Sequence, residues 1–167
     1  MIGSWGHLAR RFFWSLRVEP LAGTEIAEVA RLVDGDIFDA FMAQNDADRR
    51  HGLDSARAVQ HLGGRHDLIV AALVHDIGKR NADLGVIGRT VASVLAKLGL
   101  PTPGRLGLYL DHPRTGAEEL ASLGAPPLAV EFTRSHHGSR PQSISGEDWE
   151  LLVGADGMVV GVERSAG

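Results

Sequence analysis

Cysteine is absent from this chain of 167 residues. Disulfide bonds and thiolate metal sites are therefore excluded, and a bound metal ion must take imidazole and oxygen ligands. Long apolar runs are also missing, so we expect a cytoplasmic protein with neither a signal peptide nor a transmembrane segment. Basic residues are outnumbered, with 17 Lys and Arg against 21 Asp and Glu, which predicts no obligate nucleic-acid partner.

Strand signals are equally scarce. Apolar residues recur at helical spacing between Gly and Pro residues, and 44% of the chain is hydrophobic, without a repeat or a low-complexity tract. These features predict a single all-α domain, a helical bundle with its own core. We assign residues 1–45 to N-terminal helices that pack on this core, residues 46–162 to the main domain and residues 163–167 to a short tail.

Capping residues and helix breakers predict the individual helices. Thr24, Asp46 or Asp48, Asp67 and Ser145 are the expected N-caps. The expected helices cover about 24–33, 46–62, 68–77, 91–98, 106–110, 113–123, 127–136 and 145–156. Before them, Ala9, Phe12, Phe13 and Leu16 share a helical spacing beside arginines. This pattern predicts a helix that caps the core, and the alternative is a helix that lies on a membrane surface or a partner.

The most informative stretch is residues 71–79, Ala-Ala-Leu-Val-His-Asp-Ile-Gly-Lys. His75 and Asp76 stand at the buried end of a helix that is apolar on nearly all sides. Burial of an ionised carboxylate costs several kcal/mol, roughly, unless a cation or dense hydrogen bonding compensates. A bound divalent ion would provide that compensation. A second His-Asp pair, His66-Asp67, lacks the preceding apolar run and is predicted to lie at a helix start.

Further imidazoles and carboxylates occupy positions where a core residue or a helix end is expected, on five different predicted helices. They are His51, His75-Asp76, His112, His136-His137 and Asp156. Taken singly, each has an ordinary explanation, such as a hydrogen-bonded core histidine, a solvated pair or a cap. Together, their burial costs are hard to reconcile with marginal stability unless a ligand binds them. A helical bundle can gather such side chains into a metal site in its core.

These residues resemble the signature of the HD-domain metal-dependent phosphohydrolase superfamily, which consists of a His, a later His-Asp pair and a distant Asp. His51, His75-Asp76 and Asp156 match it in order. Residues 75–79 are similar to the HDIGK motif of the HD-GYP phosphodiesterases, residues 112–120 to their HPxxGAxxL segment, and His136-His137 to their paired histidines. The similarity covers about residues 48–160 and implies an HD-type helical bundle with a metal site in its core.

The resemblance also implies a ligand set and a reaction. One metal ion would be held by His51, His75, Asp76 and Asp156, and a second by His112, His136, His137 and the shared Asp76. Fe, Mn, Zn, Co and Ni all suit such ligands. Two such ions activate water and clamp phosphoryl oxygens, so the implied reaction is hydrolysis of a nucleotide or another small phosphoester. Asp76 and Lys79 are the expected catalytic residues, and Lys79, Arg114 and Arg140 the expected contacts to substrate phosphate.

Departures from the family pattern narrow this expectation. The GYP run does not follow His137, so cyclic-di-GMP is not the predicted substrate, and Ala47 replaces the Glu of three-metal members, which favours two ions. A mixed-valent di-iron oxygenase of the same superfamily is one alternative. A non-catalytic ligand-binding module is another, although its ligand positions would usually be eroded. A solvated charge is an equal alternative for Lys79 and the favoured one for Arg114 and Arg140.

Overall fold

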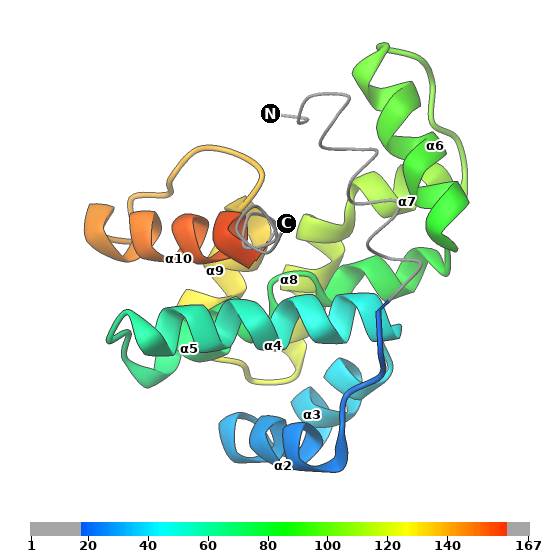
Figure 1. The fold of residues 1–167 in the computed structure, drawn as a ribbon. Coiled ribbons are helices and arrows are strands. Elements are labelled where there is room, and N and C mark those ends of the chain that lie inside the picture. Colours follow the sequence, from blue (N-terminus) through cyan, green and yellow to red (C-terminus); the bar gives the residue numbers. More distant parts are fainter. Residues whose placement is uncertain (1–17, 160–167) are drawn as a thin grey trace, which may run out of the picture.

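The computed structural model describes residues 18–159, which form one all-α domain as the sequence predicts (Figure 1). This part of the chain holds nine α-helices, one 3₁₀ helix and no strand. The α-helices are α2 (Gly23–Leu32), α3 (Gly35–Met42), α4 (Asp46–His61), α5 (His66–Val74), α6 (Val86–Lys97), α7 (Arg105–Leu110), α8 (His112–Ser122), α9 (Pro127–Ser135) and α10 (Gly146–Val159), and the 3₁₀ helix is η1 (Ile77–Ala82). The predicted helix around residues 9–16 and the tail at 163–167 lie outside the described residues, and the predicted division at residues 45 and 162 stays a prediction.

Local capping chemistry sets where several helices begin. The Asn45 side chain accepts a hydrogen bond from the Asp48 amide at 3.0 Å, so α4 starts with Asn45 as its cap and not with Asp46 or Asp48. The prediction for α10 is confirmed, because the Ser145 hydroxyl accepts a bond from the Asp148 amide at 3.1 Å. Each bond satisfies an amide that the helix itself leaves unpaired.

Three sequence predictions about helix ends are wrong. Thr24 does not cap α2; the cap residue is Ala22, whose amide donates to the Glu25 carboxylate at 2.9 Å. Asp67 lies in the first turn of α5, two residues after the Arg65 cap. The helix expected over 68–77 ends at Val74, and the chain then tightens into η1. Helix α3 was not predicted at all, although it buries Phe41 completely.

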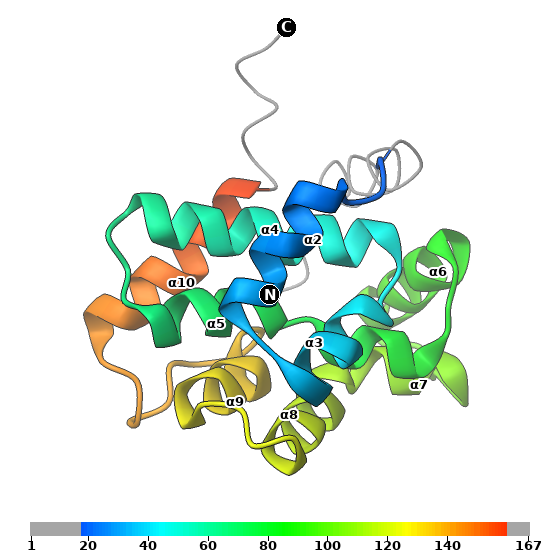
Figure 2. The ribbon, with the colours of Figure 1, turned by 90° about the horizontal axis from the view of Figure 1, so that it is seen from below.

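The core is built around α5, whose residues 68–74 are all buried. Helix α4 packs along one side of it, α9 along another, and α10 lies against both α4 and α5 (Figure 1). Helix α8 packs on α9 and on η1. Helices α6 and α7 pack on each other and form an arm at one side of the molecule (Figures 1 and 2). No helix in the described part of the chain is long and apolar enough to cross a bilayer.

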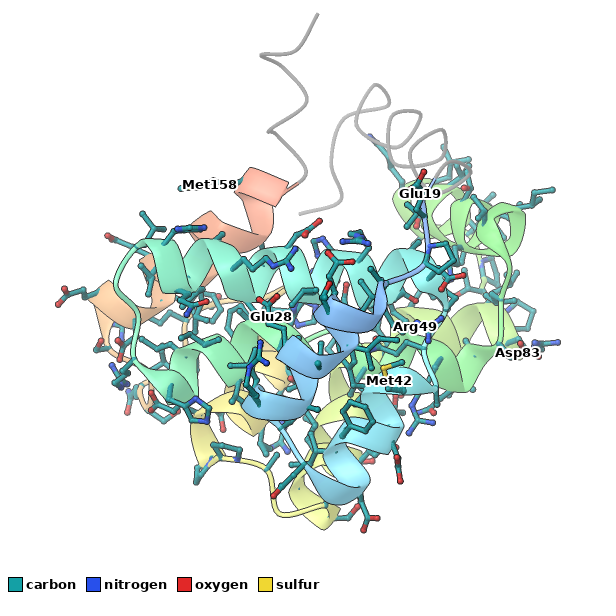
Figure 3. All side chains as sticks on the ribbon, turned by 60° about the horizontal axis from the view of Figure 1, so that its bottom comes forward. Glu19, Glu28, Met42, Arg49, Asp83 and Met158 are labelled. Carbon is teal, nitrogen blue, oxygen red and sulfur yellow. The ribbon has the colours of Figure 1, made fainter. Side chains whose placement is uncertain are left out.

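Ion pairs fasten α2 to α4. Arg57 donates to both carboxylate oxygens of Glu28 at 3.1 and 2.6 Å, and Arg50 pairs with Glu25 at 2.5 Å. Figure 3 shows Glu28 between the two helices. These pairs hold α2 against α4, the helix that carries His51.

Candidate metal centre

Five helices bring the predicted ligands together, which confirms that these residues converge in the core. His51 lies in α4, His75 and Asp76 follow α5, His112 begins α8, His136 and His137 follow α9, and Asp156 lies in α10. Two overlapping groups offer ligand atoms that all lie within 4.8 Å of one another: Asp76 with His51 and His75, and Asp76 with His112, His136 and His137. Asp156 is in neither group but contacts His51 and His75. We call His51, His75, Asp76 and Asp156 the first half of the centre, and Asp76, His112, His136 and His137 the second half.

The two oxygens of Asp76 serve different halves. Oδ2 lies 3.5 Å from Nε2 of His75 and 3.8 Å from Nε2 of His51. Oδ1 lies 3.3 Å from Nε2 of His112 and 3.5 Å from Nε2 of His136. The side chain is only 4% exposed, so solvent cannot supply its partners. A single buried carboxylate therefore faces two sets of imidazoles, as a bridging ligand between two metal ions would.

Backbone carbonyls orient three of the imidazoles in the same way. Nδ1 of His75, His112 and His136 lies 2.7–2.8 Å from the carbonyl oxygen three residues earlier, which belongs to Ala72, Tyr109 and Thr133 respectively. Each carbonyl belongs to the last turn of a helix, α5, α7 or α9. A carbonyl oxygen can only accept, so Nδ1 donates and Nε2 points at the centre. Metal-binding histidines are usually fixed by such a bond on the other ring nitrogen.

The second half is short of hydrogen-bond donors. Oδ1 of Asp76 and Nε2 of His112 and His136 are buried and have no hydrogen-bond partner. Burial lowers the pKa of His112, which keeps this ring neutral and its Nε2 an acceptor. These three atoms lie close together without a hydrogen bond, and each unsatisfied buried group costs about 1–3 kcal/mol. A metal cation would partner all three, and neutral imidazoles with a carboxylate suit a divalent transition metal.

In the first half, a proton on His75 compensates part of the negative charge of the carboxylates. Nε2 of His51 lies 2.8 Å from Oδ1 of Asp156, and Nε2 of His75 lies 3.5 Å from the same oxygen. Burial opposes the protonation of His75, but the charges of Asp76 and Asp156 outweigh it and raise the pKa of His75 to about 9. The Asp156 side chain is 31% exposed, so this half reaches solvent. A metal ion entering here would replace the proton on His75.

Lys79 is buried and not solvated. Its side chain is 4% exposed, and its ammonium group contacts Oδ2 of Asp76. The alternative of a solvated charge at a helix end is therefore wrong. In a continued α-helix Lys79 would align with His75, but η1 is a 3₁₀ helix, in which residues three apart align. Lys79 and His75 together hold the pKa of Asp76 well below its usual range, despite its burial.

Two glycines allow the backbones around the centre to approach closely. A Cβ at Gly78 would overlap the carbonyl oxygen of His112 and lie 2.7 Å from the amide nitrogen of Gly116. A Cβ at Gly52 would overlap the carbonyl oxygen of Leu73 and lie 3.1 Å from the Phe41 ring. Gly78 thus lets η1 meet α8, and Gly52 lets α4 meet α5. Both contacts lie beside metal-ligand segments.

The other predicted site residues lie apart from the two ligand groups. Arg114 is exposed and pairs with Asp111 and Glu118, and Arg140 donates to the carbonyl oxygen of Ile144 at 2.6 Å. Their contact with substrate stays a prediction. Sequence reasoning missed the last-turn carbonyls that orient the histidines. A detectable signal existed, since His75, His112 and His136 each stand one or two residues after a helix.

Comparison with known proteins adds nothing to this geometry, because no family model, no curated protein and no solved structure matches the chain. The case for a metal centre therefore rests on the ligand atoms themselves. It consists of two overlapping groups of buried His and Asp side chains that could hold metal ions.

Proposed function

We propose that this protein is a metal-dependent phosphohydrolase of the HD type, with two metal ions held by the first and second halves of the centre. The observation that carries the proposal is the divided role of Asp76, whose two oxygens face separate sets of imidazoles at 3.3–3.8 Å. Two bound ions would activate a water molecule and stabilise the charge on phosphoryl oxygens. The order of His51, His75-Asp76 and Asp156 along the chain supports the HD assignment.

The protein's own residues would divide the work as follows. Asp76 holds the two halves together, and Lys79 keeps it ionised. The four buried histidines fix the positions of the ligand nitrogens, since three of them are held by backbone carbonyls. His137 is exposed and Asp156 is partly exposed, so these two mark the side from which a substrate reaches the centre. A small phosphorylated molecule such as a nucleotide fits this half-open arrangement.

The test is metal analysis combined with a substrate panel. Protein expressed with Mn²⁺ or Fe²⁺ should contain close to two ions per chain and release phosphate from at least one nucleotide or model phosphoester. Asp76→Asn should lose both ions and the activity, because it removes the shared charged ligand. Asp67→Asn is the matched control, since Asp67 belongs to the exposed His66-Asp67 pair outside the centre, and it should change neither.

Three outcomes would contradict the proposal. Wild-type protein that carries no metal after supplementation would remove its basis. Loaded protein that consumes oxygen and releases no phosphate would replace hydrolysis with the oxygenase chemistry that the same ligand types can support. Loaded protein that binds nucleotides without consuming oxygen or releasing phosphate would point to a non-catalytic module.

A further inference from the structure

A buried ion pair connects the α6–α7 arm to the helix that carries His51. Nη1 of Arg89, in α6, lies 2.8 and 2.7 Å from the two oxygens of Asp48 in α4. The side chains are 15% and 7% exposed. Asp48 also accepts a bond from the Asn45 side chain at 2.8 Å, and Nε of Arg89 donates to the carbonyl oxygen of Leu84 at 2.9 Å. A further hydrogen bond thus fixes each member of the ion pair.

The same guanidinium group reaches the other half of the centre. Its central carbon lies over the Tyr109 ring, 5.7 Å from the ring centroid. The carbonyl oxygen of Tyr109 accepts the Nδ1–H bond of His112 at 2.7 Å, and the Tyr109 and His112 rings lie 5.7 Å apart. On α4, Asp48 precedes His51 by three residues, so the two share a helix face. Arg89 therefore contacts Tyr109, whose carbonyl orients His112, and ties it to α4, the helix that carries His51.

Stability alone is a poor reason for such a pair. The desolvation of two charges offsets most of their attraction, and an apolar pair of similar volume is often as stabilising or more so. A fixed geometry is what the pair adds, because the planar guanidinium group binds a carboxylate and stacks on a ring in defined directions. Two ions that share a ligand need a separation of about 3.5–4 Å, which depends on where His112 stands relative to α4.

We propose that Arg89 is a positioning residue of the metal centre, which holds Tyr109 and thereby His112 in the place that the second ion requires. The inference rests on the proposed two-ion centre and adds a residue outside its ligand set. Loss of Arg89 should weaken the second ion selectively. The first ion depends on His51, His75, Asp76 and Asp156, and none of the bonds of Arg89 in the described residues goes to these side chains.

The test is a Co²⁺ titration followed by visible absorption, with metal-to-protein ratios measured in parallel. Arg89→Met alone leaves Asp48 buried without its partner, so the main variant is Asp48→Leu/Arg89→Met, in which an apolar pair replaces the ion pair. Its thermal unfolding without metal checks that it folds. We expect the Kd of the second Co²⁺ to rise about 10- to 100-fold, as for other residues that orient metal ligands, with the first Kd unchanged. Arg89→Lys, which keeps the charge, should restore part of the affinity.

Arg105→Met is the matched control. Arg105 lies in the same arm, and its side chain donates to the carbonyl oxygen of Ala82 at 2.8 Å and pairs with Asp83. None of its side-chain bonds in the described residues goes to Asp48 or Tyr109. It should bind both ions as the wild type does. If the double variant also binds two ions with wild-type affinity, the role of Arg89 is refuted while the two-ion centre stands. If the wild type binds no second ion, the proposed centre itself fails, and the role of Arg89 with it.

Discussion

Replacement of Gly78 by alanine tests how the fold positions the metal centre. The new Cβ would overlap the carbonyl oxygen of His112 and lie 2.7 Å from the nitrogen and 2.9 Å from the Cα of Gly116. Ordinary contact begins at 3.4 Å, so the contact with Gly116 alone requires η1 and α8 to move apart by about 0.7 Å, and the closer overlap with His112 requires more. All three neighbours are backbone atoms, and no change of rotamer can relieve the overlap.

The size of this shift sets the expected result. Metal–ligand distances tolerate about 0.2 Å, so a displacement of His112 by at least about 0.7 Å should weaken the second ion strongly. Overpacking of a filled site costs about 1–3 kcal/mol in free energy of unfolding. For a domain of this size each kcal/mol lowers Tm by about 2–4 °C, which gives a Tm roughly 2–12 °C below that of the wild type.

Circular dichroism melts of metal-free and Mn²⁺-loaded protein, together with metal analysis, measure both effects. Gly154→Ala is the control, because Gly154 lies inside α10 and a Cβ there meets nothing within 4 Å. That substitution should stabilise the protein by about 0.5–1 kcal/mol through the lower entropy of the unfolded chain. If Gly78→Ala melts at the wild-type Tm and binds two ions, close approach at Gly78 does not position His112.

Three further predictions concern charge and protons. Hydrogen bonds from Arg50 and Arg57 help to lower the pKa of Glu25 from 4.5 to about 2, so its stabilisation is present above pH 4.5 and is lost as the pH falls towards 2. Glu25→Gln should lower the free energy of unfolding, measured with urea, by about 1–2 kcal/mol at pH 7 and leave it unchanged near pH 2. An equal decrease at both pH values would contradict this prediction. Metal binding at pH 7 should release about one proton, from His75. Titration calorimetry in buffers of different ionisation enthalpy measures this number. No release would show that His75 is neutral before the metal binds. His137→Ala should weaken one ion and spare the other, whereas loss of both would assign His137 to a shared role.

Much of the ligand set could be predicted from the sequence because its chemistry is visible in residue types. His75 and Asp76 are conspicuous after seven apolar residues, and the chain has no cysteine to offer an alternative site. The all-α fold follows from helical periodicity for the same reason. The convergence of five helices on one point depends on tertiary packing, so it could not be predicted from the sequence and is seen only in the structure.

The contacts around these side chains could not be predicted from the sequence. The end of α5 at Val74 was not predicted, because no Gly or Pro stands between Leu68 and Ile77. This end and the 3₁₀ turn that follows it bring Lys79 to Asp76. The close approach at Gly78 depends on α8, which lies far away in the chain. Asp48 was predicted as a possible helix cap, whereas in the structure its carboxylate pairs with Arg89.

The direction of the helices gives the metal centre a physical bias towards cations. Helices α5, α7 and α9 all end beside it, and their last-turn carbonyls point at the imidazole rings. A helix C-terminus carries a partial negative charge, which adds to the charges of Asp76 and Asp156. In the metal-free protein the ammonium group of Lys79, beside the shared Asp76, and a protonated His75 balance part of this charge. A metal ion entering the first half should therefore compete with the proton on His75, and an ion entering either half binds close to the charge of Lys79.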